Sequence, residues 1–154
     1  MMNNGAADIQ VRPAVPADAG ELAVLFDHYR QFYEYGADLQ LAEHFISERL
    51  TRGDSRLFVA LCEEAVVGFV QCYPGFASLE CRPSWLLSDL FVAPGFRRWG
   101  VAQALLDATR RAADTAGCCV VELFTAKTNA GAQRLYEANN YQADRQFIHY
   151  ELWL

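Results

Sequence analysis

Residues 96–108 read FRRWGVAQALLDA, a run in which Arg97, Arg98 and Gly100 come directly before a helical pattern that Gly117 ends. A helix N-terminus presents up to four unpaired N–H groups and the positive end of the helix dipole, and together these bind phosphate. Gly100 has no Cβ, so a ligand can approach the backbone there, and the two arginines add charge suited to a pyrophosphate. A plain helix start with solvated arginines explains the same residues, so both interpretations stay open at this point.

Two common phosphate-binding motifs do not match this stretch. Gly95 and Gly100 have the outer spacing of GxxxxGK[ST], but Val101 and Ala102 replace the lysine and the hydroxyl residue of a P-loop. The GxGxxG motif of dinucleotide-binding folds is also missing. The sequence therefore predicts a phosphate site without the residues for NTP hydrolysis or dinucleotide recognition.

The rest of the chain alternates between strand and helix patterns. Asp18 and Glu21 have the spacing of a capping box, and Pro74-Gly75 predicts the end of a strand. The predicted strands cover residues 9–15, 55–63, 65–73, 84–94, 118–126 (a buried strand) and 146–154, and the predicted helices cover 18–36, 38–52, 101–116 and 129–140.

The predicted order of elements is β-α-α-β-β-β-α-β-α-β. It combines antiparallel hairpins with one βαβ unit, which runs from Ser84 through the long helix to about Val121. We therefore expect an α/β fold of the mixed α+β type, with a central, mostly antiparallel sheet flanked by helices. No linker or repeat interrupts residues 1–154, which we expect to form a single domain.

Composition indicates a cytoplasmic globular protein. Hydrophobic residues make up 53% of the 154 residues and charged residues 21%. No apolar run approaches the roughly 20 residues of a membrane span, and the N-terminus lacks the pattern of a secretory signal. The five cysteines include the adjacent pair Cys118 and Cys119, and no His/Cys spacing fits zinc, so we expect neither disulfides nor a metal.

Acidic residues concentrate in the N-terminal half. Residues 21–80 hold ten of the 19 acidic side chains against four arginines, and the whole chain has a net charge of −6. A nucleic-acid binder would show the opposite bias, with a basic stripe. The balance fits a cationic partner for the N-terminal half, and a solvated acidic surface explains it equally well.

A second motif, NAGAQRLYEANNY at residues 129–141, follows the helix. Together with LFVAPGFRRWGVAQALL at residues 90–106, it resembles the GCN5-related N-acetyltransferase superfamily. Residues 97–102 match the R/Q-x-x-G-x-G/A acetyl-CoA signature, and the second motif matches N-x-x-A-x-x-L-Y-E. The predicted order of elements also matches that fold over essentially the whole chain. Asn140-Tyr141 departs from the usual Gly-Phe, but asparagine tolerates the left-handed conformation.

The resemblance implies acetyl-CoA as the cofactor. Backbone groups of residues 90–92 would pair with the pantetheine arm as an added strand would, and N–H groups of about residues 98–103 would surround the pyrophosphate. This explains why arginines and small residues crowd the helix start. The implied cofactor-binding residues are Leu90, Phe91, Val92, Arg97, Arg98, Trp99, Gly100, Val101, Ala102, Gln103 and Asn129.

The resemblance also implies catalytic residues. Tyr136 stands at the position of the superfamily's usual general acid, where a phenol can protonate the departing thiolate. A core tyrosine on a helix is the alternative. Asp89 lies beside the predicted thioester site and can deprotonate the substrate ammonium through water, although an ion pair explains it as well. Glu34 and Glu80 are weaker candidates for the base, and a chain of waters can replace a single base.

The acceptor site is expected between the first two helices, the loop at residues 73–80 and the third strand. Its implied substrate residues are Tyr33, Glu34, Tyr73 and Glu80, whose aromatic and acidic character suits an aliphatic ammonium. A polyamine, an aminoalkyl compound or a basic peptide fits this character, and we expect no nucleic-acid or membrane partner. A homodimer is expected by analogy, and a non-catalytic acyl-CoA-binding sensor is the rival function. A fainter resemblance, over residues 69–92, is to bacterial diamine and histone-type acetyltransferases.

Overall fold

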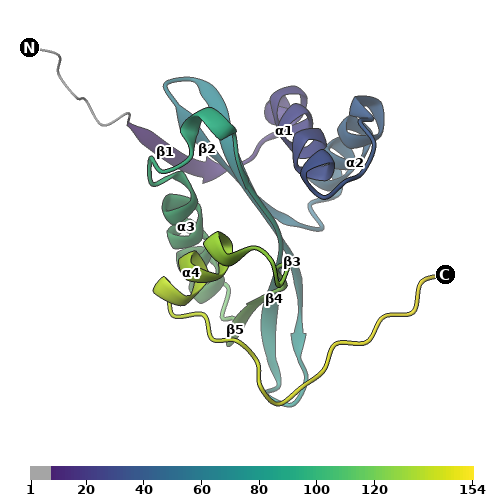
Figure 1. Ribbon diagram of the computed structural model, residues 1–154, viewed down its shortest axis with the longest axis vertical. Helices are drawn as coiled ribbons and strands as arrows, with labels where there is room; N and C mark the ends of the chain where they lie inside the picture. Colours follow the sequence, from purple (N-terminus) through teal and green to yellow (C-terminus); the bar gives the residue numbers. More distant parts are fainter. Residues whose placement is uncertain (1–7) are drawn as a thin grey trace, which may run out of the picture. The chain divides into compact units, whose positions relative to one another are not determined.

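The computed structural model describes residues 8–154, which form two compact units (Figure 1). The first unit ends at Phe124, and the second is Thr125–Leu154. The first contains β1 (Ile9–Pro13), a 3₁₀ turn η1 (Pro16–Asp18), α1 (Ala19–Phe32), α2 (Leu39–Arg52), β2 (Arg56–Cys62), β3 (Ala65–Ala77), β4 (Arg82–Val92), a 3₁₀ turn η2 (Pro94–Phe96), α3 (Val101–Thr115) and β5 (Val120–Leu123). The second contains the helix α4 (Ala130–Ala138).

The first unit is built on one five-stranded sheet in the order β1-β2-β3-β4-β5. The strands from β1 to β4 are antiparallel to their neighbours, and β5 runs parallel to β4 after the crossover through α3. Helices α1 and α2 cover one face of this sheet, and α3 covers the other (Figure 1). The predicted mixed, mostly antiparallel sheet and its single βαβ unit are confirmed.

The two faces of the sheet are packed differently. Apolar side chains from α1, α2 and the central strands form the core on the α1/α2 face: Leu22, Leu25, Ile46, Leu57, Val59, Phe69 and Phe91. On the other face, a Cβ added to Gly68 would lie 3.0 Å from Cγ1 of Val101. Glycine at this position therefore lets the first turn of α3 lie directly against β3.

Helix α2 begins and ends as its sequence predicts. The Asp38 carboxylate accepts a hydrogen bond from the backbone N–H of Leu41 at 3.0 Å, which caps the N-terminus. Gly53 adopts the left-handed conformation at φ +62° and ends the helix.

The capping box predicted at Asp18 is wrong. Asp18 pairs with Arg12 at 2.7 Å and accepts the backbone N–H of Val15 at 2.7 Å, while Glu21 accepts the N–H of Val66. A guanidinium offers a stronger, charge-assisted hydrogen bond than a helical N–H group does, and it draws the carboxylate toward β1. The bond to Arg12 lowers the pKa of Asp18.

The predicted strand end at Pro74-Gly75 is also wrong, because β3 continues to Ala77. The pairing between β2 and β3 stops at Arg56 and Cys72, whereas Pro74 still lies opposite Trp85 of β4. Beyond Cys72, no strand of the described sheet pairs with β3 on its β2 side, and proline is tolerated on edge strands.

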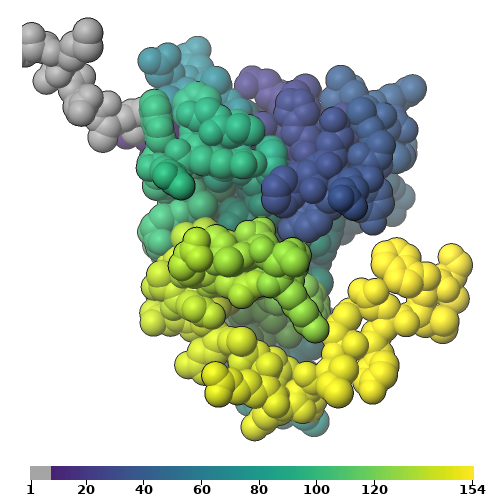
Figure 2. Space-filling model, in the orientation of Figure 1, coloured from purple at the N-terminus to yellow at the C-terminus, as the bar shows by residue number. Residues whose placement is uncertain are grey.

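Two predictions near the C-terminus need correction. The strand predicted as buried at 118–126 is the shorter β5, and none of its four residues is buried. The strand predicted at 146–154 is absent, since residues 125–154 contain one helix and no strand. Alternation specifies two faces but supplies no neighbouring strand for the backbone hydrogen bonds. Large apolar side chains there are exposed (Figure 2): Phe147, Ile148, Tyr150, Leu152, Trp153 and Leu154.

Candidate functional site

A β-bulge and an open strand edge meet in the middle of β4. Gln71 of β3 lies opposite Asp89, and the next residue, Cys72, lies opposite Leu87, so Ser88 is the extra residue of the bulge. β5 pairs with β4 only from Ser84 to Leu87. From residue 88 to 92, β4 therefore has β3 on one side and no strand of the described sheet on the other. An extended chain can add to such an edge, and the predicted pantetheine-pairing residues 90–92 lie on it.

Asp89 is a buried carboxyl group, 9% exposed, held by hydrogen bonds. Its Oδ2 accepts from Nε2 of Gln71 at 3.0 Å, and its Oδ1 accepts from Oγ of Ser88 at 3.4 Å. Gln71 is fully buried, and its Oε1 accepts a hydrogen bond from Oγ of Ser55 at 3.0 Å. Burial raises the pKa of Asp89 above its ordinary value, and hydrogen bonds from Gln71, Tyr29 and Ser88 oppose that rise.

Tyrosines gather near Asp89 on the α1/α2 face. The Tyr29 hydroxyl donates to the backbone carbonyl of Ser88 at 3.3 Å, and the Tyr29 and Tyr33 rings lie 5.2 Å apart, edge to face. Burial raises the pKa of Tyr33, and it raises the pKa of Tyr73 to about 12; the negative charge of Asp89 adds to both rises. Two predicted substrate residues, Tyr33 and Tyr73, thus lie within reach of the charge of Asp89, the predicted base.

Sequence reasoning missed three residues of this site: Tyr29, Ser55 and Gln71. A glutamine inside the apolar run of β3 was a usable signal, because a buried amide needs partners. Tyr29 gave no such signal, since its position fits an ordinary core residue of α1.

The other two predicted acceptor residues, Glu34 and Glu80, are both exposed. Glu34 follows α1, is exposed and has a left-handed backbone at φ +66°. Glu80 is exposed on the turn between β3 and β4. Arg82, where β4 begins, is about 20 Å from Asp89 along the strand at the usual rise per residue. The structure therefore does not bring Glu80 to Asp89.

The start of α3 has the features of an anion site. Gly100 is the N-cap of α3, with φ +79°. Because glycine has no side chain, no side-chain hydrogen bond caps this end of the helix. A Cβ placed on Gly100 would meet nothing within 4 Å beyond its own neighbours, so the backbone there is open. The first helical bond runs from the N–H of Ala104 to the Gly100 carbonyl, and the N–H groups of residues 101–103 precede it. These donors fit the pyrophosphate of CoA.

The two arginines before α3 differ. Nε of Arg97 donates to the Val92 carbonyl at 3.3 Å, and its guanidinium lies over the Phe91 ring at 5.6 Å, so Arg97 is held against the end of β4. Arg98 is exposed, with a left-handed backbone at φ +65°. Trp99 is 54% exposed and packs edge to face on Phe96. Of the two arginines, Arg98 is therefore the better placed to bind an anion that arrives from solvent.

The second unit contains the remaining predicted residues. Oδ1 of Asn129 accepts the N–H of Ala132 at 3.1 Å and so caps α4, which gives this asparagine a structural role. Tyr136 is partly exposed on α4, and its ring lies 5.7 Å from that of Tyr141, edge to face. Asn140 has φ +67°, as expected for an asparagine that replaces glycine after a helix.

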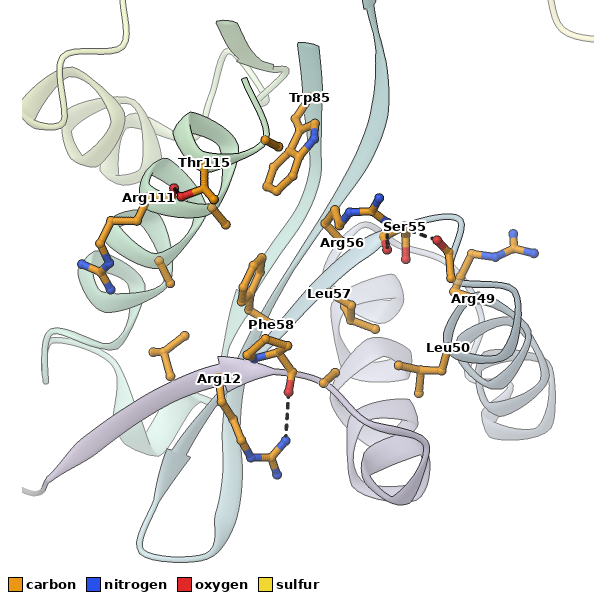
Figure 3. A pocket seen from close by; sticks show the side chains of 17 residues that line it. Arg12, Arg49, Leu50, Ser55, Arg56, Leu57, Phe58, Trp85, Arg111 and Thr115 are labelled. Carbon is orange, nitrogen blue, oxygen red and sulfur yellow. Dashed lines mark hydrogen bonds between the residues drawn. The ribbon is translucent and has the colours of Figure 1, made fainter. Parts of the chain in front are cut away.

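A cavity of about 680 Å³ lies elsewhere in the first unit (Figure 3). It opens where β1 ends and β2 begins, between the C-terminal halves of α2 and α3, and no predicted site residue lines it. Two of its arginines are paired, Arg12 with Asp18 and Arg49 with Asp54. The predicted acceptor residues thus do not line this cavity, but Ser55, which donates to Gln71 in the Asp89 network, does. Within residues 8–154, no helix has the length and hydropathy that crossing a bilayer requires.

Comparison with known proteins identifies the family. The model of the Acetyltransferase (GNAT) family matches residues 22–141. The chain is 38% identical over 142 residues to the uncharacterized N-acetyltransferase YhfO of Bacillus subtilis, an alignment that covers 92% of this chain and 95% of the relative.

Solved structures agree with this result. The crystal structure of a probable acetyltransferase matches with a TM-score of 0.89 and 32% identity over 94% of this chain and 97% of the other. An aminoglycoside N-acetyltransferase in complex with CoA has the same fold, with a TM-score of 0.80 and 21% identity over 99% of both chains. With the open edge of β4 and the uncapped start of α3, these matches show that the chain belongs to the GNAT family and is an acetyl-CoA-dependent N-acetyltransferase.

Proposed function

We propose that the enzyme acetylates a primary amine of a small cationic acceptor, either a polyamine or an aminoalkyl compound, with a basic peptide as the larger alternative. The observation that carries this proposal is the buried carboxyl group of Asp89, whose charge acts on the hydroxyl groups of Tyr33 and Tyr73. A carboxylate among aromatic rings suits an alkylammonium group, which gains both ion pairing and cation–π contact. The acidic balance of residues 21–80 favours the same class of acceptor.

Asp89 is the proposed general base. An amine must lose its proton before it can attack a carbonyl carbon, and Asp89 takes that proton, directly or through a water. Its raised pKa makes it a better proton acceptor at neutral pH than an ordinary aspartate, while Gln71 and Ser88 hold the carboxylate in one orientation. Glu34 and Glu80, both exposed, are not needed for this step.

Tyr136 is the proposed general acid. Bound acetyl-CoA supplies the thioester carbonyl that the amine attacks. When the C–S bond breaks, the Tyr136 hydroxyl gives its proton to the leaving thiolate, and the amine retains the acetyl group. A phenol, whose ordinary pKa is about 10, can protonate a thiolate of similar basicity.

The proposed cofactor contacts follow the two open backbone segments. Residues 90–92 would pair with the pantetheine arm, and residues 98–103 would bind the pyrophosphate, with Arg97 fixing the end of β4 between them. The family match crosses the boundary between the two units, so we propose that residues 1–154 form one catalytic domain. All five cysteines are free, which favours a reducing compartment and hence the cytoplasm. We also propose a homodimer.

The test is thiol release from acetyl-CoA with a panel of amines: spermidine, short diamines, amino acids, aminoglycosides and lysine peptides. Tyr136→Phe is compared with Tyr141→Phe, a matched control that removes a hydroxyl from the neighbouring ring. We expect turnover with one class of polycationic amine, a loss of about 10²–10⁴ in kcat for Tyr136→Phe, and little change for Tyr141→Phe. Turnover confined to amino acids would contradict the proposed acceptor class, and equal rates in both variants would contradict the role of Tyr136.

A further inference from the structure

The cavity at the end of β1 has a basic lining. Four of its 17 lining residues are arginines and none is acidic, although the chain carries a net charge of −6. Arg12 and Arg49 are neutralised by the ion pairs described above. Arg56 and Arg111 pair with no carboxylate of residues 8–154. The cavity therefore has positive charge that no described acidic side chain neutralises.

Arg56, where β2 begins, is the arginine best placed to hold an anion. Its Nη1 donates to the backbone carbonyl of Gly53 at 3.1 Å and to that of Ser55 at 3.2 Å, and these bonds fix the guanidinium at the cavity. Nε and Nη2 of Arg56 have no partner among the described residues. These two nitrogens form an edge of the guanidinium that binds a carboxylate through two parallel hydrogen bonds. Arg111 adds a second positive charge from α3 (Figure 3).

The remaining lining suits an apolar body. The apolar lining residues are Val11, Pro13, Ala14, Leu50, Leu57, Phe58, Trp85, Ala108, Ala112 and Ala116. The rings of Phe58 and Trp85 lie between α3 and Arg56 (Figure 3). Trp85 is 4% exposed, and its indole N–H donates to no described residue, although a buried indole usually has a partner. The cavity volume of about 680 Å³ lies in the range of about 300–1,000 Å³ that is typical of small-molecule sites.

One lining residue connects the cavity to Asp89. Ser55 has a single hydroxyl hydrogen, which it donates to Oε1 of Gln71 at 3.0 Å, and Nε2 of Gln71 donates to Oδ2 of Asp89 at 3.0 Å. The bond from Ser55 fixes which end of the Gln71 amide faces Asp89. A ligand carboxylate at Ser55 would compete for that hydrogen and leave the amide free to turn. Occupancy of the cavity would therefore reach the proposed base through two hydrogen bonds.

We propose that the cavity binds a small organic carboxylate with an apolar body, and that its occupancy is transmitted to Asp89 through Ser55 and Gln71. Arg56 takes the carboxylate, and the rings of Phe58 and Trp85 contact the apolar body. All lining residues belong to the first unit. Binding is independent of acetyl transfer, whereas the effect on catalysis rests on the proposed role of Asp89.

Calorimetry with phenylacetate tests the site. CoA is kept at saturation, so that the cofactor's own anion site is filled. We expect phenylacetate to bind about tenfold or more tightly than either 2-phenylethanol, which lacks the charge, or inorganic phosphate, which lacks the apolar body. Arg56→Gln should weaken phenylacetate binding by about tenfold or more. Arg110→Gln, next to Arg111 on α3 but outside the cavity lining, is the control and should bind phenylacetate as the parent does.

Titration of the Asp89 carboxyl carbon by NMR, assigned with Asp89→Asn, tests the transmission. Bound phenylacetate should raise the pKa of Asp89 by about one pH unit, because it adds negative charge and removes the bond that orients Gln71. The rise should be smaller in Ser55→Ala and should return in Ser55→Thr, which keeps a hydroxyl group. The titratable side chains that interact with Asp89 are unchanged in these variants: Tyr29, Tyr33, Cys72 and Tyr73.

Other outcomes overturn the proposal. Equal dissociation constants for phenylacetate in Arg56→Gln and Arg110→Gln would overturn the site, and equally tight binding of phosphate would overturn the ligand class. Bound phenylacetate that leaves the Asp89 titration unchanged would overturn the transmission. Both measurements are made without turnover, so a failure of the proposed acetyl transfer is distinguished from a failure of this site.

Discussion

At Asp89 the chain buries a carboxyl group between Gln71, Ser88 and Tyr29, the three donors that oppose its desolvation. Because burial outweighs them, the pKa of Asp89 in the folded protein lies above its ordinary value of 3.8. The native state therefore binds this proton more tightly than the unfolded state does. The contribution of Asp89 to stability is complete below its ordinary pKa and is lost as pH rises through the raised pKa.

Asp89→Asn should consequently raise Tm at neutral pH, and the gain should shrink as pH falls toward 4, because asparagine carries no charge to desolvate. Calorimetry across this range measures the effect. Asp114→Asn, at an exposed position of α3, is the control and should show no such trend. Acetyl transfer by Asp89→Asn should fall by about 10²–10⁴ if Asp89 is the general base. A fall of less than tenfold would assign proton removal to water instead.

The network around Asp89 also shows what a sequence can and cannot specify at this scale. The motifs on either side pointed to Asp89, and the aromatic residues Tyr33 and Tyr73 were predicted to share its site. The link to Gln71 was not predictable, because it depends on the bulge at Ser88. One inserted residue moves every later side chain of β4 to the opposite face, and nothing in the alternation announces that shift.

Among the elements, α3 presents its N-terminus through a left-handed glycine, Gly100, and α2 ends on another, Gly53. Neither has any atom within 4 Å of its missing Cβ beyond its own neighbours. The two glycines therefore form a matched pair of positions. At either one, a residue with a Cβ would cost about 1–2 kcal/mol in the left-handed conformation. Only Gly100 lies in the proposed phosphate site.

Gly100→Ala and Gly53→Ala should lower the free energy of unfolding by similar amounts, measured by urea denaturation. Only Gly100→Ala should weaken acetyl-CoA, with a KM raised about tenfold or more, since the added methyl group occupies the space a phosphate needs; a tenfold change corresponds to about 1.4 kcal/mol. Equal KM values in the two variants would remove the start of α3 from the cofactor site.

Element boundaries were predictable where a local residue decides them. Helix α2 has its predicted bounds to within one residue because Asp38 and Gly53 cap it, and a cap needs only its own turn. The boundaries of β5 and the structure of residues 146–154 were not predictable, because a strand needs a neighbouring strand, and its own sequence does not specify which strand that is. The C-terminal segment has the alternation of a strand but forms no strand, because no neighbouring strand in the described structure pairs with its backbone.

Across the whole molecule, the net charge of −6 arises from residues 21–80, which also contain Tyr29, Ser55 and Gln71 of the network around Asp89. A negative field attracts a polycation before it reaches the site, and salt screens that attraction: the Debye length falls from about 30 Å at 0.01 M to about 8 Å at 0.15 M ionic strength. Screening weakens encounter and binding but leaves the chemical step unchanged.

The KM for spermidine should therefore rise by about tenfold between those two ionic strengths, whereas kcat stays constant. A monoamine acceptor is the control, and its KM should rise less, because a single charge feels a proportionally smaller attraction. Steady-state kinetics at matched acetyl-CoA saturation measure both. A KM for spermidine that does not respond to salt would mean that the aromatic rings of Tyr33 and Tyr73 recognise the acceptor without help from the acidic half, which would favour a less charged amine as the substrate.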